Sequence, residues 1–550
     1  MSSPARLMNP PDWLKPAARG HHAPRRPLAS PAWLKRAAPT LIAGVLALVY
    51  VIVSPPSFDL AAHLLRAKLF NAEGFGIWNN WWYGGHHTPS YSVLFPPVSA
   101  LLTPQLAAAL AATASAAMFE SLVHRRFGAD AWLGALWFGA ATAIDLYTGR
   151  LAFAFGLLPA VATVLALQRR RAALAVLLAL LTALSSPVAA LFVAVAGAAV
   201  AGGAYVARRS PRTLVPGLAV LLTSILPVLA LAIAFPEGGS EPFTFATLWP
   251  VPVIAAVALL ALPRGEWTLR IGIAIYVIGC VVAYAVTSPV GSNAARLAAL
   301  VAGPLAALLW WRRHPRWLLA AALPLLYLQW QPPVRDVTRS ANDPSAVAGY
   351  YKPLLAFLER QSGPPFRVEI PFTGFHWEAY EVASRFPLAR GWERQLDIKD
   401  NHLFYDGSLT VSTYEAWLHQ LAVRFVAVSD GELDYSARQE VQLIDRGLPY
   451  LRLVMRSSQW RVFAVSDPSP IVQGATLESL GPNSITVRAA HPGNVLVRVR
   501  FTPYWRLGSG AGCVAPDGDL TRLALRRPGR VRLVIGFSLG RIGARSPRCT

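Results

Sequence analysis

The sequence has 550 residues, of which 54% are hydrophobic and only 15% are charged, and this composition excludes an ordinary soluble globular protein. The formal net charge is +22, which would suit a nucleic-acid-binding protein. The basic residues, however, form short clusters between apolar segments, as in proteins oriented across a membrane, so nucleic-acid binding is not expected. We interpret the chain as a multi-pass protein of the plasma membrane.

Residues 1–38 are basic and rich in proline, with seven lysines and arginines against a single acid, Asp12. They contain no long apolar run, so we expect a disordered tail on the cytoplasmic side. The apolar run that follows, Thr40 to Val53, resembles the core of a signal peptide, but no small-residue cleavage site comes after it. This favours an uncleaved first membrane span.

Residues 39–331 contain eleven apolar segments, each of which we interpret as one transmembrane helix. The stretch from Ala172 to Ala207 is too long for one crossing, and we divide it at Ser185-Ser186-Pro187 because proline breaks or kinks a helix. The basic clusters at Arg125, Arg169, Arg208, Arg264 and Arg312 then all fall on the cytoplasmic side, and the odd number of spans places the C-terminal region outside. The segments are 40–53, 93–119, 131–146, 151–167, 172–185, 187–207, 214–235, 246–262, 269–287, 294–311 and 317–330.

From about residue 331 to 550 the sequence becomes polar and contains no further span. Ser345 to Gln361 predicts a helix, and 367–370 and 424–428 predict buried strands, so residues 332–470 are expected to form a mixed α/β region. Short alternating segments between glycine and proline turns then predict a β-sandwich over residues 471–550. Three of its strands are expected at 484–488, 494–499 and 530–535.

The chain has three cysteines, one of which, Cys280, lies inside an apolar span. Cys513 and Cys549 both belong to the C-terminal region, where oxidation is permitted if the region is outside the cytoplasm. We predict a disulfide between them, and two unpaired thiols are the alternative. Their spacing does not match a metal-binding cysteine pair.

The loop after the first span, residues 54–93, concentrates polar and aromatic side chains. Asp59 and His63 stand four residues apart in a short amphipathic helix, so they share a face and could bind one ligand or one metal ion. The alternative for Asp59 is that it only caps this helix. His86 and His87 follow two glycines and could bind metal or transfer protons, or could simply pack the loop.

Four aromatic residues of the same loop, Trp78, Trp81, Trp82 and Tyr83, have two interpretations. Their rings could stack on sugar rings, since each combines an apolar face with a polar tip. They could equally form an aromatic belt at the membrane interface.

Charged residues at the outer ends of the spans are further candidates, because an ionisable side chain near hydrocarbon is costly. Asp145 and Arg150 flank one short outer turn, where a local ion pair is the alternative to a functional role. Arg296 follows the turn Pro289 to Asn293 and could bind a phosphate together with backbone N–H groups. Otherwise it only extends toward the interface.

Motifs for nucleotide-driven chemistry do not occur in a suitable context: we find no Walker loop, GxGxxG fingerprint, HExxH helix or CxxC pair. An enzyme facing outward would instead use a lipid-anchored donor. The acid Asp59 directly after the first span, the aromatic loop and the closing Phe95-Pro96-Pro97 resemble the first outer loop of the GT-C superfamily of glycosyltransferases, which use polyprenyl-phosphate sugars.

The layout also resembles that of the YfhO-like multi-spanning bacterial proteins. The similarity lies in Gly149 to Leu151, in Pro289 to Leu297 and in Tyr504-Trp505 near a late β-sandwich. It covers most of the chain in layout, through short motifs. The resemblance to the GT-C transferases implies that Asp59 is the catalytic base or a metal ligand, that Asp145 assists it, and that the sugar is transferred with inversion. The GT-C transferases often have two acids side by side at this place, whereas this chain has Asp59 followed by Leu60. The resemblance therefore leaves open whether a divalent metal ion is a cofactor.

Taken together, we expect an α-helical polytopic membrane protein of GT-C type with an extracytoplasmic C-terminal region. It would move a sugar from a polyprenyl-phosphate donor to a cell-envelope glycan or lipid acceptor. The alternatives are a transporter or flippase for lipid or polysaccharide, and a non-catalytic envelope assembly protein. The expected catalytic residues are Asp59, His63 and Asp145, and the expected substrate-binding residues are Arg150, Arg296, His86, His87, Trp82 and Tyr83.

Overall fold

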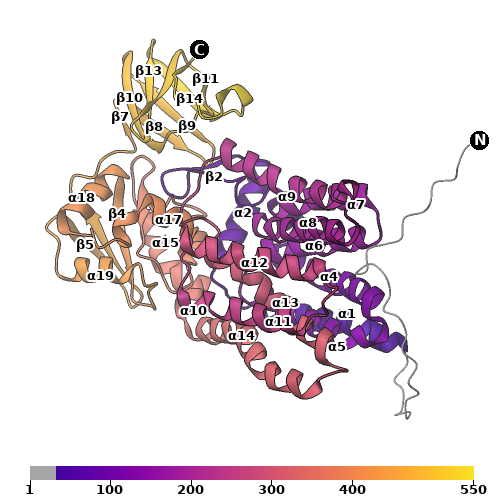
Figure 1. Ribbon diagram of the computed structural model, residues 1–550. Coiled ribbons are helices and arrows are strands. Elements are labelled where there is room, and N and C mark those ends of the chain that lie inside the picture. The colour runs from indigo at the N-terminus through magenta and orange to yellow at the C-terminus, as the bar shows by residue number, and fades with distance from the viewer. Residues whose placement is uncertain (1–31) are drawn as a thin grey trace, which may run out of the picture. The chain divides into compact units, whose positions relative to one another are not determined.

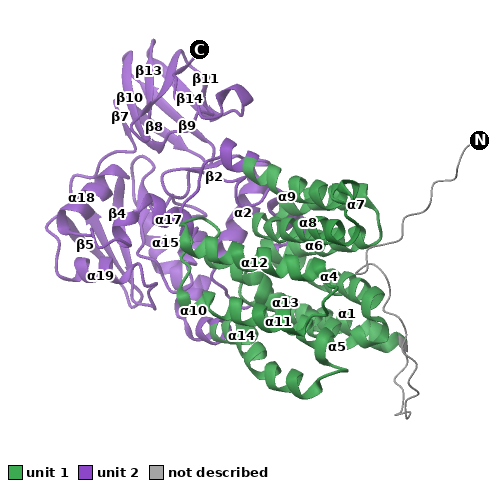
Figure 2. Ribbon diagram, viewed as in Figure 1, with its two compact units in different colours: residues 1–54, 105–229, 241–335 green, residues 55–104, 230–240, 336–550 purple. Residues whose placement is uncertain are grey.

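The computed structural model describes residues 32–550, so most of the basic segment 1–38 lies outside the described residues. The chain forms two compact units (Figure 2). Unit 1 comprises the described residues up to Ser54, Gln105–Leu229 and Glu241–Arg335, and unit 2 comprises Pro55–Pro104, Ala230–Ser240 and Asp336–Thr550. The sequence assigns the loop 54–93 to the transmembrane domain, whereas nearly all of it belongs to unit 2 in the structure.

Unit 1 is built of helices, and each of the eleven apolar segments is occupied by one helix or by parts of two (Figure 1). The division of the stretch 172–207 is as predicted: α7 ends at Ser185, and the Oγ of Ser186 accepts a hydrogen bond from the Ala189 N–H at the start of α8. The last residues of α9 and α14 belong to unit 2. The helices are α1 (Ala32–Val53), α4 (Pro104–Phe127), α5 (Trp132–Tyr147), α6 (Leu151–Gln168), α7 (Ala172–Ser185), α8 (Pro187–Arg208), α9 (Val215–Ala234), α10 (Phe245–Leu248), α11 (Pro250–Ala261), α12 (Trp267–Ala285), α13 (Arg296–Trp310) and α14 (Pro315–Asn342).

The predicted count of eleven spans is not confirmed. Within residues 32–550, seven helical stretches are long and apolar enough to cross a membrane. Helices α4 and α5 form a single stretch of 44 residues, and α7 and the stretch 245–261 are shorter than the others. Helix α14 is not among the seven, because Arg316, two glutamines and several prolines dilute its apolar sequence. The segment 93–119 is also not one helix, since the chain breaks at Thr103, which adopts a φ of 78° before Pro104.

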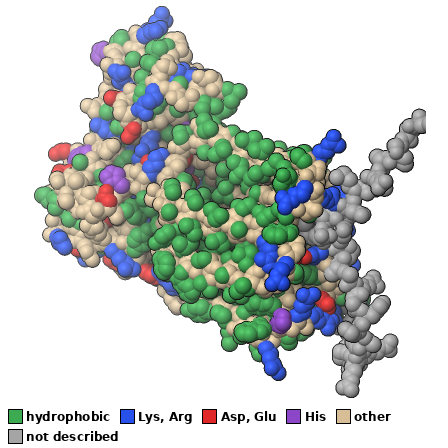
Figure 3. All heavy atoms as spheres, viewed as in Figure 1, with side chains coloured by type: hydrophobic (Ala, Val, Ile, Leu, Met, Phe, Trp, Pro, Cys, Tyr) green, Lys and Arg blue, Asp and Glu red, His purple; other side chains and the backbone are tan. Residues whose placement is uncertain are grey.

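Large apolar side chains remain exposed on the helices of unit 1. Val45 and Ile52 of α1 are 59% and 73% exposed, and Leu222 and Leu226 of α9 are 52% and 56% exposed. Figure 3 shows hydrophobic side chains covering these helices, with lysine and arginine gathered at one end of them. A soluble protein would bury surfaces of this size, so these faces are suited to lipid. The protein is a membrane protein.

Unit 2 contains an α/β region whose four-stranded sheet has the order β3-β4-β6-β5. Strands β3 and β4, both expected from the sequence, pair in parallel, and the other neighbours are antiparallel. The helix predicted at 345–361 is shorter: two 3-10 turns precede α15 (Lys352–Glu359). The remaining elements are β3 (Arg367–Glu369), α16 (Glu378–Glu381), α17 (Arg394–Asp400), α18 (Val411–Gln420), β4 (Val423–Ser429), α19 (Arg438–Asp445), β5 (Leu451–Arg456) and β6 (Trp460–Val465).

The C-terminal part of unit 2 is a β-sandwich, the architecture predicted for residues 471–550. One sheet has the order β15-β12-β13-β10-β7 and the other β11-β14-β9-β8. Their inner faces share one hydrophobic core, in which Val497 and Leu523 of the first sheet pack with Val487 and Leu533 of the second. The strands are β7 (Val472–Gln473), β8 (Thr476–Leu480), β9 (Ser484–Ala489), β10 (Gly493–Arg500), β11 (Trp505–Ser509), β12 (Gly512–Asp517), β13 (Leu520–Leu525), β14 (Gly529–Ile535) and β15 (Arg548–Cys549).

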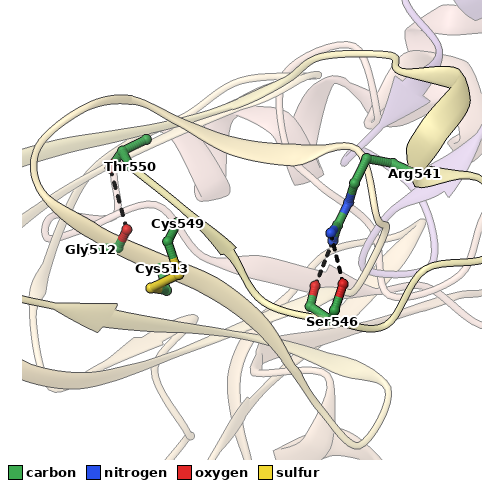
Figure 4. The surroundings of a disulfide bond; sticks show 6 residues. All are labelled: Gly512, Cys513, Arg541, Ser546, Cys549 and Thr550. Carbon is green, nitrogen blue, oxygen red and sulfur yellow. Dashed lines mark hydrogen bonds between the residues drawn. A yellow bond between two sulfur atoms is a disulfide. The ribbon is translucent and has the colours of Figure 1, made fainter.

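A disulfide joins Cys513 of β12 to Cys549 of β15 (Figure 4). The two residues are directly paired across the strands, with their Cα atoms 3.9 Å apart. Beside them the Thr550 N–H donates to the Gly512 carbonyl at 3.0 Å. The chain end is therefore fastened to the edge of the sandwich.

The first loop of the chain also belongs to unit 2. It contains α2 (Leu60–Glu73), the two short strands β1 (Trp78–Asn79) and β2 (His86–His87), and α3 (Phe95–Leu102). Leu65, Trp82 and Tyr83 of this loop lie in one hydrophobic core with Val368 and Leu396 of the α/β region. The loop is thus an integral part of the fold of unit 2.

Candidate functional site

Asp59 stands at the N-cap position of α2, but its side chain makes no capping hydrogen bond. Its Oδ1 instead accepts a hydrogen bond from the indole Nε1–H of Trp392, at 2.9 Å. The carboxylate is half-buried, and a residue of the α/β region fixes its direction. Capping alone therefore does not account for Asp59.

Trp392 is itself held by neighbours of unit 2. Its ring stacks on that of His376, with centroids 3.4 Å apart and an interplanar angle of 9°. The guanidinium of Arg394 lies 4.9 Å from the Trp392 ring and binds both carboxylate oxygens of Asp434 at 3.1 and 2.7 Å. Burial raises the pKa of Asp434, but the charges of His376 and Arg394 outweigh it, so the pKa is lowered and the carboxylate stays ionised. The indole that orients Asp59 has little freedom to turn.

His63 lies one helical turn after Asp59 and is almost completely buried. Its ring packs against Phe95, edge-on at 5.1 Å, and against Tyr91 at 5.8 Å. The helix predicted from their spacing is present as α2, which contains His63 and begins directly after Asp59. Within residues 32–550, no group of three or more histidine, cysteine, aspartate or glutamate side chains has the arrangement of a metal site.

Arg66, which the sequence reasoning missed, lies on the same helix. It forms an ion pair with Glu393, and its guanidinium lies 3.9 Å from the ring centre of Tyr91. Burial by itself lowers the pKa of Arg66, but Glu393, Tyr91 and Asp59 outweigh it, so the pKa is raised. A permanent positive charge thus stands near the Asp59 carboxylate.

His86 and His87 are both buried and have partners within unit 2. A ring nitrogen of His86 lies 3.1 Å from the Asn79 amide, and burial lowers the pKa of His86. His87 binds Glu237 through Nδ1, at 2.7 Å, and Thr502 through Nε2, at 2.9 Å. The contacts of His87 connect the first loop to the segment 230–240 and to the β-sandwich, whereas His86 contacts Asn79 within the hairpin of β1 and β2. Substrate binding by these two histidines stays a prediction.

Trp82 and Tyr83 have no exposed surface. The indole N–H of Trp82 donates to the Ala379 carbonyl, and the Tyr83 hydroxyl accepts from the Glu393 N–H at 2.9 Å. Their rings therefore pack the core of unit 2 and do not present a stacking surface. The following Gly85 has a φ of 114°, and a Cβ there would lie 2.3 Å from the Trp78 ring, so the turn requires glycine.

Asp145, Arg150 and Arg296 lie together in unit 1. Asp145 is in the last turn of α5 and is 4% exposed, Arg150 immediately precedes α6, and Arg296 begins α13. Both guanidinium groups interact electrostatically with Asp145. The Arg296 guanidinium also lies 5.4 Å from the Phe153 ring. The structure thus brings these three predicted residues together, while Asp59 and His63 belong to the other unit.

A second buried charge cluster in unit 2 has no recognisable sequence signal. Arg390 binds both oxygens of Asp397 at 3.1 and 2.7 Å and one oxygen of Glu440 at 3.2 Å, and Glu369 lies 4.0 Å away. All four side chains are at most 1% exposed. Burial raises the pKa of Glu440 to about 7 and raises that of Glu369 well above its usual range. We name Arg390, Asp397, Glu440 and Glu369 the Arg390 cluster.

No protein-family model matches the chain, and no curated protein matches it either. Among solved structures, the chain is similar to the archaeal oligosaccharyltransferase AglB from Archaeoglobus fulgidus, in complex with an inhibitory peptide and a dolichol-phosphate. The match covers 72% of this chain and 70% of that chain, at 11% identity and a TM-score of 0.35.

Proposed function

We propose that the protein is an integral-membrane glycosyltransferase that moves a sugar from a polyprenyl-phosphate donor to a cell-envelope acceptor on the extracytoplasmic side. The observation that carries the proposal is the Asp59 carboxylate, which is oriented by Trp392 and not used for helix capping. The apolar helices of unit 1 suit a lipid-linked donor, and the disulfide of unit 2 suits an oxidising compartment.

In this proposal Asp59 is the catalytic base. It takes the proton of the acceptor hydroxyl, whose oxygen then attacks the anomeric carbon of the sugar. The bond between that carbon and the phosphate oxygen breaks, and polyprenyl phosphate leaves with the electron pair. Because attack and departure occur on opposite faces, the anomeric configuration is inverted.

Arg150 and Arg296 have the chemistry to stabilise the charge that develops on the leaving phosphate. Asp145 interacts with both of them and would hold their guanidinium groups in position. His63, on the helix that Asp59 begins, would fix the direction of that helix through its contacts with Tyr91 and Phe95. These are the roles that the residues of each unit take in the proposal.

The test is transfer by the purified full chain in nanodiscs, with a panel of radiolabelled polyprenyl-phosphate sugars and release of polyprenyl phosphate as the readout. Asp59→Asn should lower kcat by about 10²- to 10⁴-fold, the usual contribution of a general base. Asp445→Asn removes an exposed carboxylate of the same unit, paired with Arg461, and should leave the rate unchanged.

Trp392→Phe is the sharper variant, because it keeps an aromatic ring against His376 and removes only the N–H that orients Asp59. A hydrogen bond to a charged group contributes roughly 1.5 kcal/mol or more, so we expect kcat to fall about 10-fold with little change in KM. Full activity of Asp59→Asn, or no turnover of any donor by the unaltered protein, would contradict the proposal.

A non-catalytic envelope assembly protein is the second candidate. It is favoured by the burial of Trp82, Tyr83, His86 and His87, whose contacts serve the fold of unit 2. In that case Asp59→Asn would leave envelope assembly in cells unaffected, whereas a variant that unfolds unit 2 would abolish it. The comparison of these two variants in cells separates the candidates.

A further inference from the structure

The β-sandwich of unit 2 is strongly basic. Residues 471–550 contain twelve arginines, no lysine and only three acids, Glu478, Asp517 and Asp519. Figure 3 shows several lysine and arginine side chains on this part of the molecule. The arginines are Arg488, Arg498, Arg500, Arg506, Arg522, Arg526, Arg527, Arg530, Arg532, Arg541, Arg545 and Arg548.

Four of these arginines share one outer surface. In the sheet β11-β14-β9-β8, alternate residues point into the core, so the residues between them point outward. Trp505, Leu507, Val531 and Leu533 are buried in the core, which directs the neighbouring arginines to the other side. We name these outward residues the arginine face: Arg506 of β11, Arg530 and Arg532 of β14, and Arg488 of β9, all of them exposed.

The arginine face already binds one carboxylate of the chain. Arg530 and Arg488 are directly opposite each other, an arrangement that like charges normally disfavour. Glu478 of β8 relieves the repulsion, because its two oxygens accept hydrogen bonds from the Nε–H of Arg488 at 2.6 Å and of Arg530 at 2.7 Å. The surface is thus built so that guanidinium groups of adjacent strands hold a carboxylate between them.

The remaining outward positions of this sheet are mostly polar. They include Thr476, Ser484, Thr486 and Ser509, with Val534 as an apolar member, and Thr486 and Ser509 are paired with Arg532. Surfaces that insert into a bilayer carry aromatic or large apolar residues next to the basic ones. The face therefore fits an extended polyanion better than a lipid bilayer.

We propose that the arginine face binds an acidic polysaccharide through its carboxylates, and that this polysaccharide is the acceptor. The second part rests on the proposed function. Neighbouring strands lie about 4.8 Å apart and alternate residues about 7 Å apart, so the guanidinium groups form a two-dimensional array that can engage several carboxylates of one chain. The disulfide between Cys513 and Cys549 in the same sandwich is typical of oxidising compartments, where nucleic acid is not the expected polyanion.

The experiment measures binding of the full chain, in nanodiscs of neutral lipid, to polygalacturonate, with uncharged dextran as the reference. We expect binding to polygalacturonate alone, weakening as salt is added. Arg506→Gln with Arg532→Gln leaves the Glu478 contacts intact and should weaken binding roughly 2- to 30-fold, since each exposed ion pair contributes up to about a factor of five. Arg452→Gln with Arg456→Gln removes the same charge from exposed positions of β5 and should change binding less than 2-fold.

Glu478→Gln should strengthen the binding of polygalacturonate, whereas the arginine variants weaken it. It releases Arg488 and Arg530 from their internal carboxylate, so polygalacturonate should bind up to about 5-fold more tightly. A purely structural role of Glu478 would give equal or weaker binding. Equal losses in the β5 control, no change in the Arg506 and Arg532 variant, or stronger binding to anionic vesicles or duplex DNA would overturn the proposal.

The Asp59→Asn variant tests the acceptor assignment separately from the transferase proposal. If both hold, this variant binds polygalacturonate as tightly as the unaltered protein and transfers no sugar. If the unaltered protein binds polygalacturonate but turns over none of the donors, the arginine face binds glycan without sugar transfer. This result overturns the proposal that the polysaccharide is the acceptor. If transfer is normal in the Arg506 and Arg532 variant at low acceptor concentration, the acceptor does not use the face.

Discussion

Arg390→Met should destabilise unit 2 more than any comparable substitution on its surface. The Arg390 guanidinium is 1% exposed, binds Asp397 through two hydrogen bonds and Glu440 through one, and lies 3.9 Å from the ring centre of Phe372. Methionine fills a similar volume beside the rings of Phe372 and Phe404 but supplies no charge. The bidentate ion pair with Asp397 is then broken, and breaking a buried ion pair from one side typically costs about 3 to 5 kcal/mol.

The assay is resistance of the full chain to proteolysis across a urea series, with cleavage inside residues 336–470 as the signal. Arg385→Met is the matched control, because Arg385 is 56% exposed and pairs with Glu359, so its loss should cost less than about 1 kcal/mol. Arg390→Lys keeps a charge but loses the bidentate fork and should fall between the two. This variant remains informative if Arg390→Met does not fold.

The reasoning would be refuted if Arg390→Met and Arg385→Met lowered the free energy of unfolding equally. Such a result would mean that the buried acids of the Arg390 cluster take up protons at no significant cost. Measuring the free energy of unfolding at two pH values identifies proton uptake, since the destabilisation caused by Arg390→Met would then grow as the pH rises.

Three further predictions concern pH, redox state and topology. Burial raises the pKa of Glu440 to about 7, so the stabilising contribution of this group is complete below about pH 4 and is lost as the pH rises toward 7. Urea unfolding at several pH values should show that Glu440→Gln reduces this loss of unfolding free energy by about 3 kcal/mol. If the variant had the same pH dependence as the unaltered protein, Glu440 would not be the titrating group. Cys513→Ser opens a loop with a sequence separation of 36 and should cost roughly 3 to 4 kcal/mol, measured as increased proteolysis of the sandwich, with Cys280→Ser as the control. A membrane-impermeant thiol reagent applied to intact cells should label Ser412→Cys and not Gly265→Cys, and the reverse pattern would exclude an extracytoplasmic C-terminal region.

The elements of the fold could largely be predicted from the sequence, because they depend on local patterns. Apolar runs predicted the positions of the helices of unit 1, and Pro187 marked the start of α8. Alternating residues predicted β9, β10 and β14. The break at Thr103 was missed although Pro104 signals it, since the residue before a proline is disfavoured in a helix.

The candidate site could be predicted only in part. The spacing of Asp59 and His63 predicted a helix here, and α2 contains His63 and begins directly after Asp59, its N-cap residue. The sequence could not show whether Trp82 and Tyr83 are exposed, since burial depends on the residues that other segments bring against them. Aromatic residues in a loop are compatible with either outcome.

Only the tertiary structure decided the partners of the charged residues. Trp392 lies 333 residues after the Asp59 that it orients, and Glu393 lies 327 residues after Arg66. Periodicity reports the secondary structure of a segment and the face that it buries, but it carries no information on which distant segment will cover that face. The sequence by itself therefore determined that unit 1 is built of apolar helices, the strands β9, β10 and β14, and the position of Asp59 directly before α2, while the path of the folded chain decided what each side chain contacts.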